Sequence, residues 1–177
     1  NSSKIVVATK TTNANGEIVF DDLKLGTYTL EETKAPSGYE LDSTPKDVTI
    51  TVKAQQVLAP ITNQETLGSL KLVKVDAADA TKKLAGAEFK LTNSSKIVVA
   101  KTTNANGEIV FDDLKLGTYT LEETKAPAGY DLDGTVRNIT ISGKAQQVLA
   151  PIKNVETLGS LKLIKVDAAD ATKKLAG

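Results

Sequence analysis

The sequence predicts an all-β protein in which a small sandwich domain repeats along the chain. Apolar and polar residues alternate with a period of two in short runs, which is typical of half-buried strands. Gly, Asn, Asp and Pro bound these runs, and Asn-Ala-Asn-Gly between two of them is a hairpin signal. Residues 10–36 recur unchanged as 101–127, an offset of 91 residues (101 − 10), so the repeating unit is a whole small domain.

The ends of the chain are out of register with this repeat. Residues 69–154 form a complete repeat, residues 1–63 match a repeat without its first two strands, and residues 160–177 match only the first strand. We expect residues 64–68 and 155–159 to be short linkers, which suit a semi-rigid rod. No Met and no secretion signal are present, which fits an interior fragment or a processed product.

The complete repeat is expected to contain seven strands with Greek-key connections, as in a β-sandwich. The predicted strands are residues 69–76, 87–91, 96–103, 107–111, 118–123, 136–142 and 146–154. We interpret the stretch 76–84 as a loop. The segment 87–92 occurs only once in the chain, so the second strand has no copy elsewhere.

The composition excludes several classes of function. The 177 residues include 22 basic and 22 acidic side chains and therefore lack the basic excess of a nucleic-acid-binding protein. No apolar run is long enough to span a bilayer. His and Cys are absent, which removes disulfides, the commonest metal ligand and the commonest general base. We expect no cofactor, no metal and no enzyme with turnover.

Three polar residues fall at inward positions of the predicted strands. Each follows an apolar row on one face of its strand: Lys74 after Leu70 and Leu72, Glu123 after Tyr119 and Leu121, and Asn154 after Val148, Ala150 and Ile152. Burial favours the neutral forms of Lys and Glu, and a neutral amine is a nucleophile. A neutral Lys amine that is held against an Asn amide, beside a protonated Glu, is positioned for transamidation with release of ammonia. A buried Lys–Glu ion pair, or solvated strand ends, would fit the same pattern.

At these residues the chain resembles the B-type repeat domains of Cna-like collagen adhesins and related pilins. The most specific piece is Tyr-Thr-Leu-Glu-Glu-Thr-Lys-Ala-Pro-Ala-Gly-Tyr at residues 119–130. The resemblance implies a CnaB-type sandwich, which is prealbumin-like or reverse-immunoglobulin-like. It also implies that Glu123 is the catalytic residue of an isopeptide bond between Lys74, two residues before Asp76, and Asn154 at the end of the last strand.

The partial repeats carry the remaining candidates. Glu32 and Asn63 match the catalytic Glu and the acceptor Asn, and Lys165 matches the reactive Lys. Lys165 of one molecule could therefore complement Glu32 and Asn63 of the next and give a head-to-tail, covalent fibre. The lack of a second strand in the partial repeat counts against this hypothesis.

The resemblance implies a structural stalk that holds an adhesive domain away from the cell wall of a Gram-positive bacterium, on the extracellular side. Its partners would be neighbouring repeats, and a host-matrix ligand would be bound only by other domains. A pilin subunit is an alternative, although the chain has no Tyr-Pro-Lys-like sortase motif. A module that binds host matrix directly is a further alternative, but four Tyr and three Phe provide little material for a groove.

Overall fold

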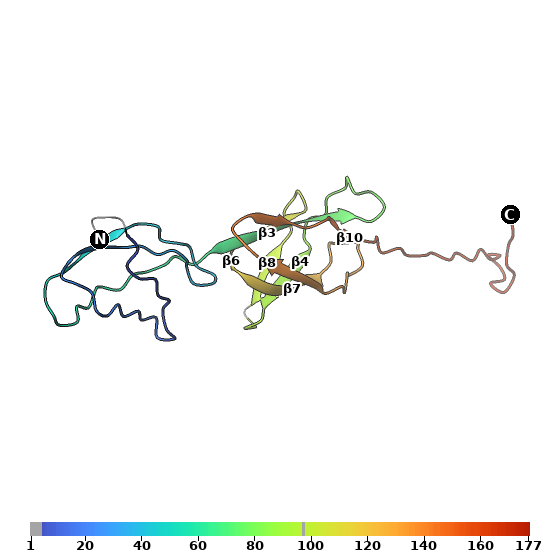
Figure 1. The fold of residues 1–177 in the computed structure, drawn as a ribbon. Coiled ribbons are helices and arrows are strands. Elements are labelled where there is room, and N and C mark those ends of the chain that lie inside the picture. Colours follow the sequence, from blue (N-terminus) through green and yellow to red (C-terminus); the bar gives the residue numbers. More distant parts are fainter. Residues whose placement is uncertain (1–4, 97) are drawn as a thin grey trace. The chain divides into compact units, whose positions relative to one another are not determined.

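The computed structural model describes residues 5–96 and 98–177, and its regular elements are all strands (Figure 1). The chain divides into two compact units, Asn1–Leu67 (unit 1) and Gly68–Gly177 (unit 2). The first four residues of the predicted partial repeat lie outside the described residues. No helix in the described part of the chain is long and apolar enough to cross a membrane.

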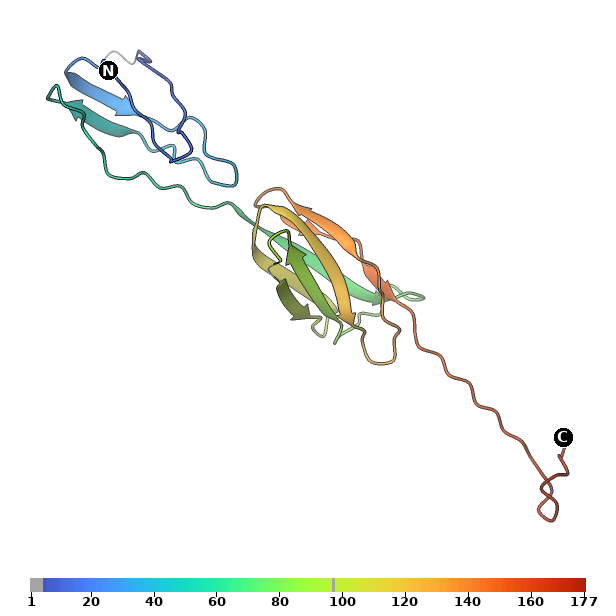
Figure 2. The ribbon, with the colours of Figure 1, turned by 90° about the horizontal axis from the view of Figure 1, so that it is seen from below.

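Unit 2 contains two sheets that face each other as the layers of a sandwich (Figure 2). The first sheet has the order β10-β3-β6, with β9 also pairing with β3, and the second has the order β5-β4-β7-β8. The bounds are β3 Leu67–Asp76, β4 Glu88–Asn93, β5 Val98–Thr102, β6 Glu108–Lys115, β7 Gly117–Lys125, β8 Arg137–Ile141, β9 Gln146–Val148 and β10 Ile152–Asn154. The prediction of an all-β sandwich is confirmed.

The core lies between these two sheets. Side chains from β3, β4, β6, β7, β8 and β10 form one apolar cluster, in which Leu70, Leu72, Phe89, Phe111 and Leu121 have no exposed surface. Alternate residues point outward, and several of them form ion pairs on the sheet surfaces, such as Lys90 with Glu122 at 3.0 Å. The period-two pattern therefore gave the correct inward faces of β3 and β7.

The predicted last strand, 146–154, is wrong as a single element. It is divided into β9 and β10, because Pro151 has no N–H to donate to a sheet ladder. The break also changes the phase of the strand. Val148 is 62% exposed and Ala150 is exposed, whereas Leu149 packs against the core. Only Ile152 and Asn154 of the predicted row face inward.

The third strand also begins later than the predicted 96–103. Lys96 has a φ of 59° and its N–H donates to Asn93 O at 2.9 Å, so it belongs to a turn, and the strand β5 starts at Val98. Ile97 lies outside the described residues. The stretch 76–84 contains no helix and closes through an isolated bridge between Val75 and Lys83.

Among its described residues, unit 1 contains one antiparallel pair of strands, β1 Gly26–Leu30 with β2 Lys46–Ile50, and an isolated bridge between Tyr39 and Glu65. Its register repeats that of β7 and β8, since Gly26 pairs with Ile50 as Gly117 pairs with Ile141. None of the described residues of unit 1 is buried. Unit 1 therefore keeps the local pairing of the repeat without its core.

Candidate functional site

The parallel pairing of β3 with β10 brings the predicted Lys and Asn to the same end of one sheet. Ile152 pairs with Lys74, and Asn154 pairs with Asp76. Glu123 reaches them from β7 in the opposite sheet, where it pairs with Phe89. Lys74, Glu123 and Asn154, which come from three strands, therefore meet inside the sandwich, where they are 0%, 5% and 2% exposed.

The Glu123 carboxyl group bridges the other two side chains. Its Oε1 lies 3.2 Å from Lys74 Nζ, and its Oε2 accepts a hydrogen bond from Asn154 Nδ2 at 2.9 Å. The Lys74 and Glu123 side chains are both wholly inaccessible to solvent. The Lys74 amine is the close partner of Glu123 Oε1, whereas Asn154 Oδ1 is buried without a hydrogen-bond partner, which is uncommon in a protein interior.

Burial lowers the pKa of Lys74, while the charge of Glu123 and its contact with the amine oppose this effect. The ammonium group has few other partners. It donates to Lys153 O at 3.3 Å and lies 5.5 Å from the centre of the Phe89 ring. Water is excluded from the amine, so the neutral form of Lys74 is favoured more than in solution.

Two backbone groups of the loop after β7 complete the site, and sequence reasoning missed both. Asp131 O accepts a second hydrogen bond from Asn154 Nδ2 at 2.6 Å, and Asp133 N–H donates to Glu123 Oε2 at 2.8 Å. The sequence does not reveal the role of the Asp131 carbonyl, because every residue type has this group. The turn that positions the Asp133 N–H could have been predicted, because Asp133 Oδ1 accepts from Thr135 N–H at 3.0 Å in the Asx-turn that an Asp-Gly-Thr sequence favours.

Asp133 is held in its charged form. Burial alone would raise the pKa of Asp133, but hydrogen bonds from Thr135 and Arg137 outweigh it and lower the pKa to about 2. Arg137 Nη2 lies 2.6 Å from Asp133 Oδ2. The loop that positions Glu123 is thus fixed to the start of β8.

A polar cluster borders the site next to Lys74. Tyr130 Oη donates to Asp76 Oδ2 at 2.8 Å, and Lys82 Nζ lies 3.5 Å from the same carboxylate. N–H groups of Asp79 and Ala78, together with the Tyr130 hydroxyl and Lys82, lower the pKa of Asp76 to about 2. Lys82 also lies 2.6 Å from Glu156, so the cluster joins the hairpin after β3 to the segment after β10.

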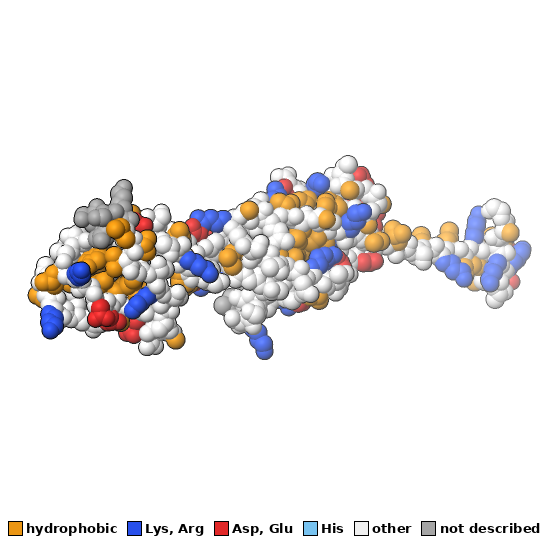
Figure 3. All heavy atoms as spheres, viewed as in Figure 1, with side chains coloured by type: hydrophobic (Ala, Val, Ile, Leu, Met, Phe, Trp, Pro, Cys, Tyr) orange, Lys and Arg blue, Asp and Glu red, His pale blue; other side chains and the backbone are white. Residues whose placement is uncertain are grey.

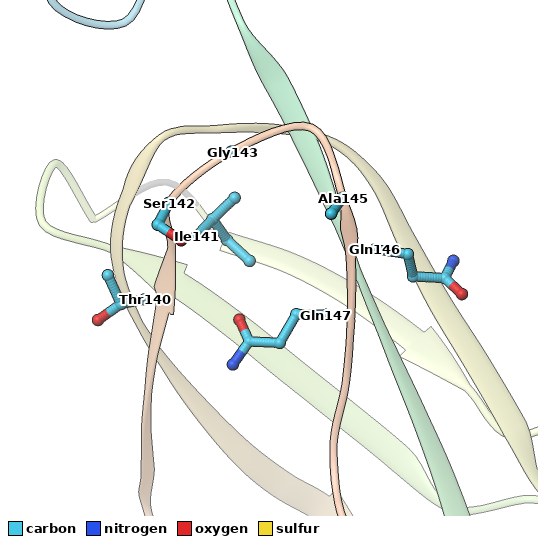
Figure 4. Close-up of a pocket in the computed structure, with 7 residues that line it drawn as sticks. All are labelled: Thr140, Ile141, Ser142, Gly143, Ala145, Gln146 and Gln147. Carbon is cyan, nitrogen blue, oxygen red and sulfur yellow. The ribbon is translucent and has the colours of Figure 1, made fainter.

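One hollow of unit 2 is lined by none of the predicted site residues. It has a volume of about 290 Å³ and lies within the turn from β8 to β9, where Ile141 and Gln147 stand between the two arms (Figure 4). Its lining has no charged side chain. In the described residues, no group of three or more acidic, His or Cys side chains is arranged to hold a metal ion.

A family model described as a prealbumin-like fold domain, SpaA, matches residues 1–65 and again residues 68–155. The chain belongs to this SpaA family. Both halves of the internal repeat therefore carry a SpaA domain, and the predicted repeat of a CnaB-like sandwich is confirmed.

Solved structures that resemble this pair of SpaA domains come from Gram-positive bacteria. The TIE protein of Bacillus anthracis is 30% identical with a TM-score of 0.77, over 82% of this chain and 28% of that chain. A streptococcal ancillary pilin is 29% identical with a TM-score of 0.45, over 76% and 43%. The major pilin SpaD of Corynebacterium diphtheriae is 28% identical with a TM-score of 0.43, over 51% and 30%. The chain thus spans less than half of each of these proteins, and no curated protein matches it.

The SpaA domain of unit 1 contains a second copy of half of the site. Asn63 Nδ2 donates to Glu32 Oε2 at 2.7 Å and to Glu40 O at 2.9 Å, and Asp42 N–H donates to Glu32 Oε2 at 2.8 Å. These three hydrogen bonds correspond one by one to those of Glu123 and Asn154. Glu32 and Asn63 are only partly buried, and Lys165, in the segment after unit 2's sandwich, is exposed. In the described residues, only the site of unit 2 has Lys, Glu and Asn together.

Proposed function

We propose that these SpaA domains form a structural stalk on the outer surface of a Gram-positive bacterium, and that the complete domain locks itself with an isopeptide bond between Lys74 and Asn154. The observation that carries the proposal is the Glu123 carboxyl group, which contacts the amine through one oxygen and the amide through the other, in a site closed to solvent. The match to the SpaA family, whose solved relatives include pilins, supports the location.

Three features support this reactivity. A buried ion pair is costly, since the attraction between its charges only partly offsets their desolvation. An uncharged amide in the same place removes that cost. The lowered pKa of Lys74, caused first by burial, increases the fraction of neutral amine that can act as a nucleophile. The strands hold both reacting groups in place, which replaces a bimolecular encounter with a fixed geometry.

The proposed reaction is a transamidation without any co-reactant. The lone pair of Lys74 Nζ forms a bond to Asn154 Cγ, and the proton released from the amine moves to Glu123 Oε1, 3.2 Å from Nζ. Glu123 then gives a proton through Oε2 to Asn154 Nδ2, 2.9 Å away. The bond from Cγ to Nδ2 breaks, and ammonia leaves. Glu123 returns to its first state, while the Lys and the Asn are consumed, so the domain reacts once and is not an enzyme with turnover.

The position of the bond suits a protein that bears tension. The chain enters the domain at the start of β3 and leaves it after β10, which are neighbouring parallel strands. With Lys74 joined to Asn154, a pull on the two ends passes along β3, through the bond and out of β10. The 79 residues between them (75–153) carry no load. Without the bond, the same pull would separate β3 from β10 and extend this segment.

Intact-mass measurement of the denatured protein, followed by peptide mapping, tests the proposal. We expect a mass that is lower by one ammonia and a single peptide species that contains Lys74 joined to Asn154. The Glu123→Gln variant keeps the size of the side chain but cannot carry the proton, so it should show the full mass. A folded wild-type protein of full mass, with separate Lys74 and Asn154 peptides, would refute the bond.

A further inference from the structure

We propose that Arg137 is a positioning residue for the isopeptide reaction: it holds Asp133 against Glu123 and cancels the negative charge that Asp133 places beside the Lys74 amine. The inference rests on the proposed function, because it concerns the same transamidation. It assigns a role to two residues outside the Lys, the Glu and the Asn of the reaction. Arg137 acts through Asp133 and not on the reacting atoms.

Arg137 occupies an inward position of its strand. It precedes Ile139 and Ile141 in β8 at the spacing of two that keeps side chains on one face, and both Ile side chains belong to the core. Its cross-strand neighbour is Leu121 of β7, a core residue that lies two positions before Glu123. Arg137 therefore continues the apolar row of β8 toward the site, as Glu123 continues the row of β7.

A cation at an inward position requires a partner. Basic and acidic side chains are both visible on the outer surface of unit 2, where water screens their charges (Figure 3). The side chains of Arg137 and Asp133 are only 28% and 18% exposed, so most of each lies out of water. Charges in such surroundings are paired, and Arg137 Nη2 lies 2.6 Å from Asp133 Oδ2. The two residues therefore act as one unit of the domain interior.

Arg137 also fixes the backbone of the loop that contacts Glu123. Its Nη1 donates to Thr135 O at 3.1 Å, and the Thr135 N–H donates to Asp133 Oδ1 at 3.0 Å. Together with the ion pair, these hydrogen bonds close residues 133–137 into a turn. The Asp133 N–H points out of this turn and donates to Glu123 Oε2 at 2.8 Å. The carboxyl group that contacts both reacting side chains is therefore held, through the turn, by Arg137.

The groups around the Lys74 amine differ in charge from one element to the next. The charged side chains are Glu123 of β7, Asp133 of the loop after β7, Arg137 of β8 and Asp76 of the same strand β3. The uncharged groups are the Phe89 ring of β4 and the Lys153 carbonyl of β10. Asp76 has its own cation, because Lys82 Nζ lies 3.5 Å from its Oδ2. Arg137 provides the same balance for Asp133.

This balance determines when the amine is free to react. Burial lowers the pKa of Lys74, the charges of Glu123 and Asp133 oppose burial, and the charge of Arg137 acts in the same direction as burial. Without Arg137, the uncompensated Asp133 carboxylate would favour the binding of protons by the coupled pair of Lys74 and Glu123. The neutral amine would then form only at higher pH. Arg137 therefore widens the pH range in which the domain can form its bond.

Unit 1 contains a matched version of the pair in which a lysine takes the place of the arginine. Lys46 is the counterpart of Arg137, and its Nζ lies 3.5 Å from Asp42 Oδ2. The Thr44 N–H donates to Asp42 Oδ1 at 3.1 Å, and the Asp42 N–H donates to Glu32 Oε2 at 2.8 Å. The turn and its contact with the Glu are thus the same in both copies. A lysine at this position is compatible with the geometry, which makes Arg137→Lys the conservative variant.

The test measures the rate of bond formation as a function of pH in the full 177-residue chain. A photocaged lysine at position 74 keeps the amine blocked until the protein is irradiated. The protein is deprotected in guanidinium and diluted into buffers of different pH, and intact mass follows the loss of ammonia with time. Hydrogen exchange of peptides that contain β4 confirms that unit 2 has folded in each sample, because the segment 87–92 occurs once in the chain.

The two members of the pair should shift the rate in opposite directions. Arg137→Gln should move the curve of rate against pH to higher pH and slow the reaction about tenfold at a fixed pH on its rising limb. Asp133→Asn keeps an acceptor for the Thr135 N–H but removes the charge, so it should move the curve to lower pH. The double variant and Arg137→Lys should both return the curve close to that of the wild type. Lys46→Gln, the matched change in unit 1, should leave the curve unchanged.

Opposite shifts decide between this role and a merely structural one, because a loss of structure would slow both single variants at every pH. Slowing of both variants without opposite shifts, or unchanged curves in both, would overturn the inference and leave the proposed function intact. If Arg137→Gln does not fold, the shift of Asp133→Asn to lower pH remains the required result. Folded wild-type protein that keeps its full mass at every pH would refute the proposed function and this inference with it.

Discussion

The stability of unit 2 should depend strongly on the proposed cross-link, and the size of this effect follows from the structure. The bond would join residues that are 80 positions apart in the chain (154 − 74). Closing a loop of this length lowers the entropy of the unfolded chain enough to stabilise the fold by about 4.5 kcal/mol near room temperature. Lys74→Met prevents the bond and fills the space with an apolar side chain, so it should lower the free energy of unfolding by at least this amount.

Lys74→Met also leaves Glu123 Oε1 without the Nζ group that lies 3.2 Å from it, a polar contact that the cross-linked protein would keep as an amide. The double variant Lys74→Met/Glu123→Gln removes the acidic group as well and therefore separates the effect of the cross-link from the cost of leaving that carboxyl unpaired. Guanidinium unfolding measures the free energy, and hydrogen exchange of peptides that contain β4 reports on unit 2 alone, because the segment 87–92 occurs once in the chain. Lys165→Met, the same substitution at an exposed copy of the same sequence, should leave unit 2 unchanged. A double variant within about 1 kcal/mol of the wild type would refute the loop-closure argument.

Three further predictions compare matched positions or pH values. Gly107→Ala should destabilise unit 2 strongly, because the new Cβ would lie 2.5 Å from a backbone oxygen of β3. Gly16→Ala introduces similar backbone strain without that clash. Unfolding curves of both variants measure the difference. Thr103→Val should cost about 1–3 kcal/mol, because this buried hydroxyl donates to Leu84 O and accepts from Ala87 N–H, both at 2.9 Å, while Thr12→Val at the exposed counterpart should be neutral in the same assay. The pKa of Asp133 is lowered from 3.8 to about 2, so its contribution to the stability of unit 2 is present above pH 3.8 and is lost as the pH falls through about 2. In a variant without the cross-link, acid titration should show a shallower loss of stability after the further change Asp133→Asn. Equal slopes with and without that change would contradict the assignment.

The sequence predicted the inward residues of β3 and β7 because nothing interrupts their alternation. Lys74 and Glu123 each continue an unbroken apolar row. The register shift between β4 and β7 follows the pair of Phe89 with Glu123 and therefore does not alter the direction of Glu123. The last strand shows the limit of this reasoning. Pro151 divides it and changes its phase, so Val148 faces solvent although Asn154 faces the core. The inward direction predicted for Asn154 was correct because only the residues after Pro151 decide it.

The groups that hold the site together were less predictable. Asp131 acts through its carbonyl oxygen and Asp133 acts on Glu123 through its N–H, and every residue type except Pro offers both groups. The partial repeat illustrates this, because Glu40 takes the place of Asp131 without changing the hydrogen bond. A backbone contact of this kind depends on the path of the loop, which composition and alternation do not specify.

A comparison of the two copies of the site shows what the loop contributes and what the first strand contributes. Unit 1 has the hydrogen bonds of Glu32 and Asn63 although its described residues include no copy of β3, so the loop and its neighbouring strands position the carboxyl and amide groups unaided. What β3 adds in unit 2 is the amine and the exclusion of water, since Glu123 and Asn154 are buried and their counterparts are only partly buried. A hydrated ammonium group is a poor nucleophile, so the bond should form only after β3 has docked and the core has closed over the amine. Folding would then precede the proposed cross-link, and the cross-link would make permanent a strand arrangement that core packing has already selected.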